Sequence, residues 1–180
     1  MIGVTCIGRT MLTGFLLIGA LIAPISAVAQ DATPTAACPA TTEQENVAIA
    51  QRWTDDVINV GNLAALDEIA ASDIVHHAGT FPDRTGVDGV KEVLGALIAG
   101  FPDVRQTVEQ VITDDSMVVT RWSATGTHQG EFQGYEPSGE PVTWTGINIF
   151  RIECGKIAEE WSEVDGAGRI AQFEENAQTP

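Results

Sequence analysis

Basic residues are scarce in this chain. Its 180 residues include nine Lys and Arg against 25 Asp and Glu, which gives a formal net charge of −16 at pH 7. A protein this acidic repels phosphate backbones and anionic lipid headgroups. The composition therefore argues against nucleic acid as a partner.

Cysteine and histidine are also few, with three of each. The cysteines are Cys6, Cys38 and Cys154, and none of them belongs to a Cys-x-x-Cys pair of the kind that marks redox or zinc sites. The histidines are not spaced like the ligands of a compact metal site. The spacing of the cysteines and histidines thus predicts no metal site.

Long apolar runs are missing except near the N-terminus. Residues 11–23 form an almost unbroken apolar run of about 13 residues, which follows Arg9 and precedes Ala27-Val28-Ala29. A positive charge, an apolar run and a small-residue cleavage site in this order are typical of a secretory signal peptide, which we assign to residues 1–29. A membrane-spanning helix needs about 20 residues. We therefore expect a secreted, extracytoplasmic protein without stable membrane association after signal cleavage.

The mature chain is expected to have three parts. Residues 30–41 are rich in Ala, Thr and Pro and predict a flexible spacer, residues 42–175 form one folded domain, and residues 176–180 form a short tail. Export permits a disulfide between Cys38 and Cys154. Two buried free thiols are the alternative that the sequence leaves open.

The spacing of apolar residues changes at Pro102. Before it, apolar residues recur at helical spacing, starting from a capping box at Thr42 and Glu45 and interrupted by a short extended piece at residues 73–77. After it they alternate, which predicts four strands: Val104–Thr113, Met117–His128, Val142–Glu153 and Ile157–Asp165. Helices followed by antiparallel strands predict an α+β fold, with the helices covering one face of a curved sheet and leaving a pocket between the layers.

A series of short motifs runs through the second half in a fixed order. They are Gly126–Gly134 (GTHQGEFQG), Pro137–Gly139, Gly146–Arg151 (GINIFR) and Gly155–Trp161 (GKIAEEW), followed by Asp165 and Gln172, with His77, Gly86 and Phe101-Pro102-Asp103 upstream. Each motif alone is weak. In this order and spacing, over residues 43–172, they resemble the SnoaL-like polyketide cyclase family.

The resemblance implies the cone-shaped fold of nuclear transport factor two, with three N-terminal helices on a curved, mostly antiparallel sheet that encloses a pocket. It also implies ring closure by intramolecular aldol condensation, through acid–base chemistry without a metal or cofactor. The base would be Asp165, at the end of the last strand. Family members commonly form homodimers or larger assemblies. Export departs from this picture, because polyketide ring closure accompanies a synthase inside the cell.

The last strand supplies the candidate base when the residues are considered alone. Alternation along the strand predicts one shared face for Ile157, Glu159, Trp161, Glu163 and Asp165. A carboxylate beside an aromatic ring and other acids is a candidate general base, since desolvation and like charges raise its proton affinity. Asp165 followed by Gly166 is also a common way to begin a turn.

Donors to an enolate oxygen are the second requirement of an aldol closure. His77 and His128 are the candidates, and we group them with Asp165 as catalytic. His76 and His77 are adjacent, so on a strand they face opposite ways and one of them is expected to be solvated. Residues expected to bind the substrate are Trp53, Phe132, Trp144, Arg151 and Trp161.

Three functions remain open at this point. The first is a small-molecule cyclase or isomerase that acts on a carbonyl compound. The second is a secreted binding module without turnover, and the third is a hydrolase of the epoxide-hydrolase type. A buried Asp165 that is hydrogen-bonded to His77 or His128 and open to a pocket would favour catalysis. An apolar pocket with Asp165 facing solvent would favour binding.

Overall fold

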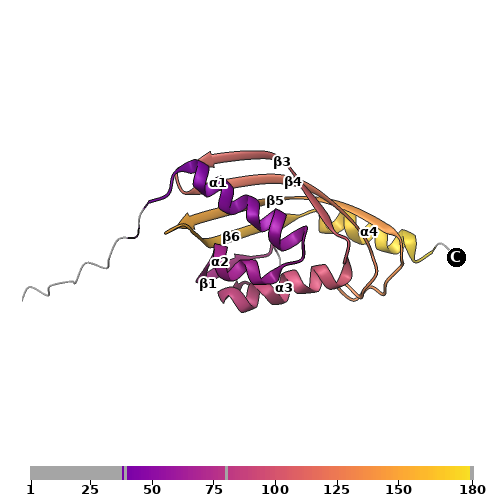
Figure 1. The fold of residues 1–180 in the computed structure, drawn as a ribbon. Coiled ribbons are helices and arrows are strands. Elements are labelled where there is room, and N and C mark those ends of the chain that lie inside the picture. Colours follow the sequence, from indigo (N-terminus) through magenta and orange to yellow (C-terminus); the bar gives the residue numbers. More distant parts are fainter. Residues whose placement is uncertain (1–37, 39, 80, 179–180) are drawn as a thin grey trace, which may run out of the picture. The chain divides into compact units, whose positions relative to one another are not determined.

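A computed structural model describes Cys38, residues 40–79 and residues 81–178 (Figure 1). The predicted signal peptide and the mature N-terminus at Gln30 lie outside the described residues, as does most of the spacer. Within the described part of the chain, no helix is long and apolar enough to cross a membrane.

The first helix starts at the predicted capping box. Thr42 donates its backbone N–H to Glu45 Oε2 at 2.8 Å, and Glu45 N–H donates to Thr42 Oγ1 at 3.3 Å, so two amides left free by the helix start are satisfied. Helix α1 (Glu43–Arg52) then widens into a π-helical turn, η1 (Trp53–Ile58), whose amide at Asn59 bonds to the carbonyl of Thr54. Such turns are frequent at functional sites.

Three further helical segments precede Pro102, and one follows the sheet. The elements are η2 (Leu63–Ala65), α2 (Leu66–Ile69), α3 (Gly86–Gly100) and α4 (Gly166–Asn176). The sequence analysis did not predict α4. Two features of the sequence could have predicted it. Asp165 is a suitable N-cap, and Arg169 and Phe173, the two buried residues of the helix, follow it at helical spacing, four and eight positions on. We had considered Asp165 only as a base or the start of a turn.

Six strands form one sheet in the order β2-β1-β6-β5-β4-β3. They are β1 (Ala70–His77), β2 (Arg84–Thr85), β3 (Arg105–Asp114), β4 (Met117–Thr127), β5 (Pro141–Glu153) and β6 (Lys156–Val164). All neighbours are antiparallel except β1 and β6, which are parallel. In Figure 1 the sheet is curved and α1, α2 and α3 lie on one side of it. The α+β class is confirmed.

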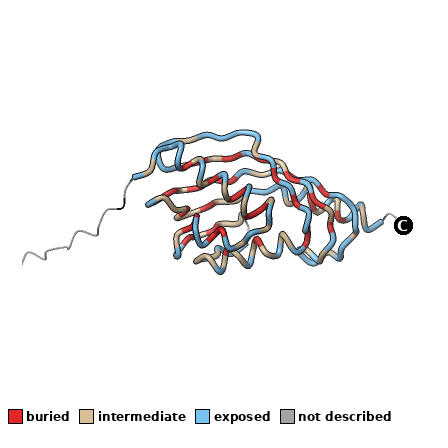
Figure 2. The backbone as a smooth tube through the Cα atoms, viewed as in Figure 1, coloured by how far each residue is buried: buried red, intermediate tan, exposed pale blue. Residues whose placement is uncertain are grey.

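One face of the sheet is buried against the helices. Along β4 and β5, buried and more exposed residues alternate, as Figure 2 shows. Val118, Trp122 and Phe150 contribute to the core, whereas Ile112 and Ile147 are exposed. Residues that face the helices are therefore the ones that can line an internal pocket.

A β-bulge in β6 changes which of its side chains point to each face of the sheet. Ile157 pairs with Ile152 and Glu159 pairs with Arg151, so Ala158 is an extra residue on β6. Ile157 and Glu160 are consequently both fully buried, while Glu159 is only partly buried. The predicted shared face of Ile157 and Glu159 was wrong, because alternation holds only within an unbulged stretch.

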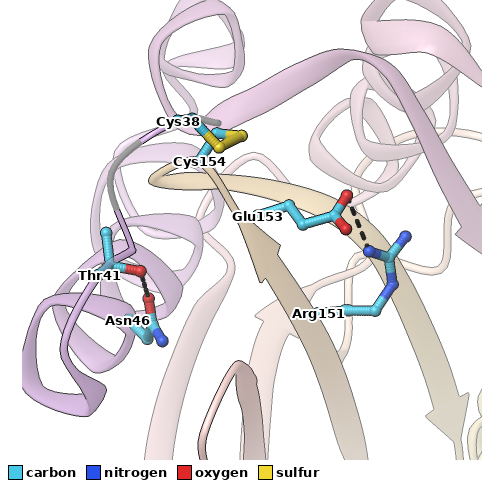
Figure 3. Close-up of a disulfide and its surroundings, with 6 residues drawn as sticks. All are labelled: Cys38, Thr41, Asn46, Arg151, Glu153 and Cys154. Atoms are coloured by element: carbon cyan, nitrogen blue, oxygen red, sulfur yellow. Dashed lines mark hydrogen bonds and ion pairs between the residues drawn. A yellow bond between two sulfur atoms is a disulfide. The ribbon is translucent and has the colours of Figure 1, made fainter. Parts of the chain in front are cut away.

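The disulfide between Cys38 and Cys154 is formed, with a Cα–Cα distance of 5.2 Å. Figure 3 shows that it joins the segment before α1 to the turn between β5 and β6. It closes a loop with a sequence separation of 116 residues. The alternative of two free thiols is thereby excluded in this structure.

Candidate functional site

A cavity of about 60 Å³ lies between η1, α3 and the helix-facing side of the sheet. Its apolar walls include Trp53, Leu94 and Trp144, and its polar lining residues are His76, Gln106, Asn148, Ser162 and Arg169. This volume accommodates a few water molecules, and drug-sized ligand pockets are several times larger. The cavity therefore fits a compact molecule, or one functional group of a larger one.

His76 and Glu160 form a buried pair at this cavity. They are register partners on the parallel strands β1 and β6, and His76 Nδ1 contacts Glu160 Oε2. The side chains are 3% and 0% exposed. His76 Nε2 is buried and has no hydrogen-bond partner among the described residues. When an ionised Glu160 accepts the Nδ1 proton of a neutral imidazole, Nε2 carries the free lone pair.

Two further side chains hold Glu160 in place. Asn148 Nδ2 donates to Glu160 Oε1, and Trp122 Nε1 donates to Asn148 Oδ1. Because the indole N–H can only donate, it fixes which end of the Asn148 amide is oxygen. Gly146 makes this possible, since a Cβ at that position would collide with the Trp122 ring. The result is a buried chain of hydrogen bonds from Trp122 to His76.

His77 lies on the opposite face of β1. Its ring stacks on Trp161 with centroids 5.2 Å apart, and its Nε2 and Nδ1 lie 3.0 Å from Glu159 Oε1 and Asp83 Oδ1. The hydrogen bond with Glu159 raises the pKa of His77, and the one with Asp83 adds to this against the effect of burial. His77 thus sits in a half-buried ionic cluster outside the cavity.

Arg151 belongs to the same cluster. Its Nε donates to Glu159 Oε2 at 3.0 Å and its Nη1 pairs with Glu153 (Figure 3). His77 and then Arg151 lower the pKa of Glu159. The predicted residues His77, Arg151 and Trp161 are therefore brought together, but around Glu159 and away from the residues that line the cavity.

His128 is fully buried in an aromatic cluster. Its ring stacks on Phe173 at 4.6 Å and on Phe101 at 5.4 Å. Neither ring nitrogen has a hydrogen-bond partner of normal geometry in the described part of the chain. Burial lowers the pKa of His128, and a weaker interaction with the backbone of Gly130 offsets part of this. His128 does not line the cavity.

Asp165 is exposed and caps α4, with its Oδ1 accepting the N–H of Gly168 at 2.8 Å. It makes no hydrogen bond to His77 or His128. Its neighbour Val164 and the α4 residue Arg169 do line the cavity. Asp165 therefore lies near the cavity, and its role as the base stays a prediction.

The predicted substrate-binding residues divide into three groups. Trp53 and Trp144 line the cavity, and Trp53 stacks on the His76 ring at a centroid distance of 6.4 Å. Phe132 lies beneath the guanidinium of Arg169, whose Cζ is 4.8 Å from the ring centroid. Arg151 and Trp161 lie in the outer cluster.

Sequence reasoning missed His76, Glu160, Asn148 and Arg169. His76 was passed over because His77 fits the family motif. Glu160 was missed because alternation places Glu159 on the face of Ile157, and the bulge at Ala158 that reverses this cannot be seen in the alternation. Asn148 has a usable signal, since it is a polar residue in the alternating series of β5 that also holds Val142, Trp144, Phe150 and Ile152.

The fold and the site together define an α+β protein with a mostly apolar cavity, carrying a few polar side chains, on the helix-covered face of a curved sheet. Comparison with known proteins identifies the class. The family model of the SnoaL-like polyketide cyclases matches residues 48–173, and the chain belongs to this family. No curated protein sequence matches the chain closely enough to count as a relative.

Solved structures agree with the family assignment. IdmH, a proposed polyketide cyclase from Streptomyces antibioticus, is 30% identical with a TM-score of 0.63, over 72% of this chain and 98% of that chain. A proposed SnoaL-like polyketide cyclase from Jannaschia sp. CCS1 is 22% identical with a TM-score of 0.70, over 79% of this chain and 98% of that chain. At this lower identity the second likeness establishes the fold alone.

Proposed function

We propose that this protein catalyses proton transfer at a carbon next to a carbonyl group, leading to an aldol-type ring closure, with His76 as the base. One observation carries the proposal: the buried imidazole of His76, a residue that lines the cavity, is held at Nδ1 by Glu160, and its Nε2 has no hydrogen-bond partner among the described residues. Membership in the SnoaL-like family supports a cyclase- or isomerase-type function.

The proton moves in two steps. His76 Nε2 takes the proton from the α-carbon, which leaves an enolate, and the imidazolium that forms is stabilised by the Glu160 carboxylate. The α-carbon then bonds to a second carbonyl carbon of the same molecule, and the alkoxide takes the proton back from Nε2. Atoms and electrons balance without an oxidant or a second substrate, because the product is an isomer of the substrate.

We also propose that the protein works outside the cytoplasm. The disulfide between Cys38 and Cys154 supports this, because such bonds persist in oxidising compartments. A compartment without a polyketide synthase favours a small, diffusible carbonyl compound over a carrier-bound chain. The cavity volume of about 60 Å³ favours the same choice.

Asp165 is the rival base. Its support is the motif resemblance and its position next to Val164, which lines the cavity. Its weakness is exposure to solvent and use of its carboxylate as a helix cap. The two bases predict different variants to be inactive.

Proton abstraction can be tested before the natural substrate is known. Levulinate, a compact keto acid, is incubated with the protein in D₂O, and loss of the proton signals beside the ketone is followed by NMR. We expect acceleration by the native protein and a loss of about 10²–10⁴-fold in His76→Gln. His77→Gln is the matched control and keeps the native rate.

The outcomes separate the proposals. Loss of exchange in Asp165→Asn, with His76→Gln unaffected, assigns the base to Asp165. Absence of exchange in the native protein, with levulinate and with a panel of neutral ketones and diketones, contradicts catalysis and leaves a binding module.

A further inference from the structure

Arg169 is a buried cation that the proposed reaction does not use. It lies in the first turn of α4, is only 6% exposed, and lines the cavity. Its guanidinium carbon lies 4.8 Å from the centroid of Phe132 and 5.5 Å from that of Trp144. The two rings offer it cation–π contacts but no counter-charge.

Its hydrogen bonding is incomplete. One Nη2 bond runs to Gln133 Oε1 at 3.3 Å, and Nε has no partner within the described residues. Among those residues no carboxylate lies within ion-pair distance of the guanidinium. Asp165 attracts it only from farther away, while burial lowers the pKa of Arg169. Burying a charge without a partner is strongly unfavourable.

We propose that Arg169 binds a carboxylate group of the substrate, so that the protein acts on compact keto acids and not on their esters. This inference rests on the proposed function, because it takes the substrate of His76 to be the molecule that Arg169 binds. His76 and Arg169 line the same cavity. The carboxylate supplies the missing counter-charge and accepts the unused N–H groups. It also fixes which carbon faces His76 Nε2.

The chemistry of the cavity favours a carboxylate over a phosphate. Arg169 is the only Lys or Arg among the described residues that line it. The cavity can therefore neutralise a ligand with one negative charge but not a ligand with two. The planar guanidinium matches a planar carboxylate through two parallel hydrogen bonds. The net charge of −16 further disfavours a doubly charged ligand.

The test compares an acid with its own ester. Levulinate and methyl levulinate are titrated into native protein, Arg169→Met and His76→Gln, with binding followed by amide chemical shifts. We expect the native protein to bind the acid about 10–100-fold more tightly than the ester, as for a charge-assisted hydrogen bond. Arg169→Met should bind both equally, and His76→Gln should keep the preference.

Folding of the variant is measured in the same samples. Methionine has similar length and no charge, so Arg169→Met without ligand should unfold at the native temperature or above it. Levulinate should raise the unfolding temperature of the native protein but not of Arg169→Met. A marked loss of stability in Arg169→Met would assign Arg169 a structural role and overturn the inference.

The carboxylate inference and the proposed catalysis can be contradicted independently of each other. Equal binding of acid and ester by the native protein, or a preference that survives in Arg169→Met, overturns the carboxylate inference even when α-proton exchange is fast. Tight, Arg169-dependent binding of levulinate without any exchange supports the inference and contradicts the proposed catalysis.

Discussion

Two histidine–glutamate pairs occupy the two faces of the same pair of strands. His76 and Glu160 are essentially inaccessible, and His77 and Glu159 are 26% and 25% exposed. The inner pair has neutral neighbours, Asn148 and Trp122, that fix its geometry. The outer pair is shared with Arg151 and Asp83, so that charges there compensate one another. Identical residue types therefore give a buried pair beside the cavity on one side and a surface ion cluster on the other.

The difference shows that burial and neighbours, not residue type, decide what a histidine can do. In a surface cluster, water and dissolved salt ions weaken each ion pair. In the buried pair, a hydrogen bond is stronger and an unpaired group is more costly. The predictions below test this contrast.

The largest effect is expected from removing the inner carboxylate. Glu160→Ala leaves His76 Nδ1 and Asn148 Nδ2 buried without their shared acceptor, and each unsatisfied buried group costs about 1–3 kcal/mol. Glu159→Ala removes the outer carboxylate and should cost about 1 kcal/mol or less, as surface pairs do. Urea unfolding of both variants measures the difference. Equal losses would contradict the contrast between the two faces.

The second effect concerns the residues that position Glu160. Trp122→Phe removes the N–H that orients the Asn148 amide, leaving Oδ1 buried and unsatisfied at a cost of about 1–3 kcal/mol. It should also slow α-proton exchange, since Glu160 and His76 lose their fixed orientation. Trp161→Phe on the outer face is the matched control and should leave exchange unchanged. Exchange that is slowed equally in both variants would place the effect in general stability.

Much of the fold was predictable from sequence because it depends on local signals. The capping box at Thr42, the change of period at Pro102 and the turn at Cys154 each determine an element boundary within a few residues. Only two cysteines follow the predicted cleavage site, so the sequence identified the possible disulfide partners but left open whether the bond forms. Helix α4 was missed because its start, Asp165-Gly166, was considered as a base or turn and not as an N-cap.

The site was harder to predict because it depends on tertiary pairing. The β1–β6 register places His76 beside Glu160, although 84 positions separate them in sequence. The bulge at Ala158 then decides which glutamate of the Glu159-Glu160 pair faces inward. Neither the register nor the bulge has a signal in a single sequence.

His128 extends the comparison to a buried histidine without a carboxylate. Burial lowers its pKa, so the folded state resists protonation while the unfolded state does not. Stability should therefore fall as the pH drops through the ordinary histidine value of about 6.5. His128→Phe keeps the stacking on Phe101 and Phe173 and should flatten this acid limb. Unfolding free energies measured from pH 8 to pH 5 give the two curves, and identical slopes would mean that His128 is not buried neutral.

The smallest effect is expected from His77 in the outer cluster. The pH dependence of its contribution to stability has the opposite sign to that of His128. The hydrogen bond to Glu159 raises the pKa of His77 in the folded state. Its contribution is therefore fully present below about pH 6.5 and is lost as the pH rises through the folded-state value. His77→Gln should lose stability in the acid range and match the native protein at higher pH, with a difference of about 1 kcal/mol or less because the cluster is partly solvated. Added salt should reduce the difference further, since surface ion pairs are screened. A loss that persists at high pH and high salt would show that His77 stabilises the fold by packing on Trp161 and not by its charge.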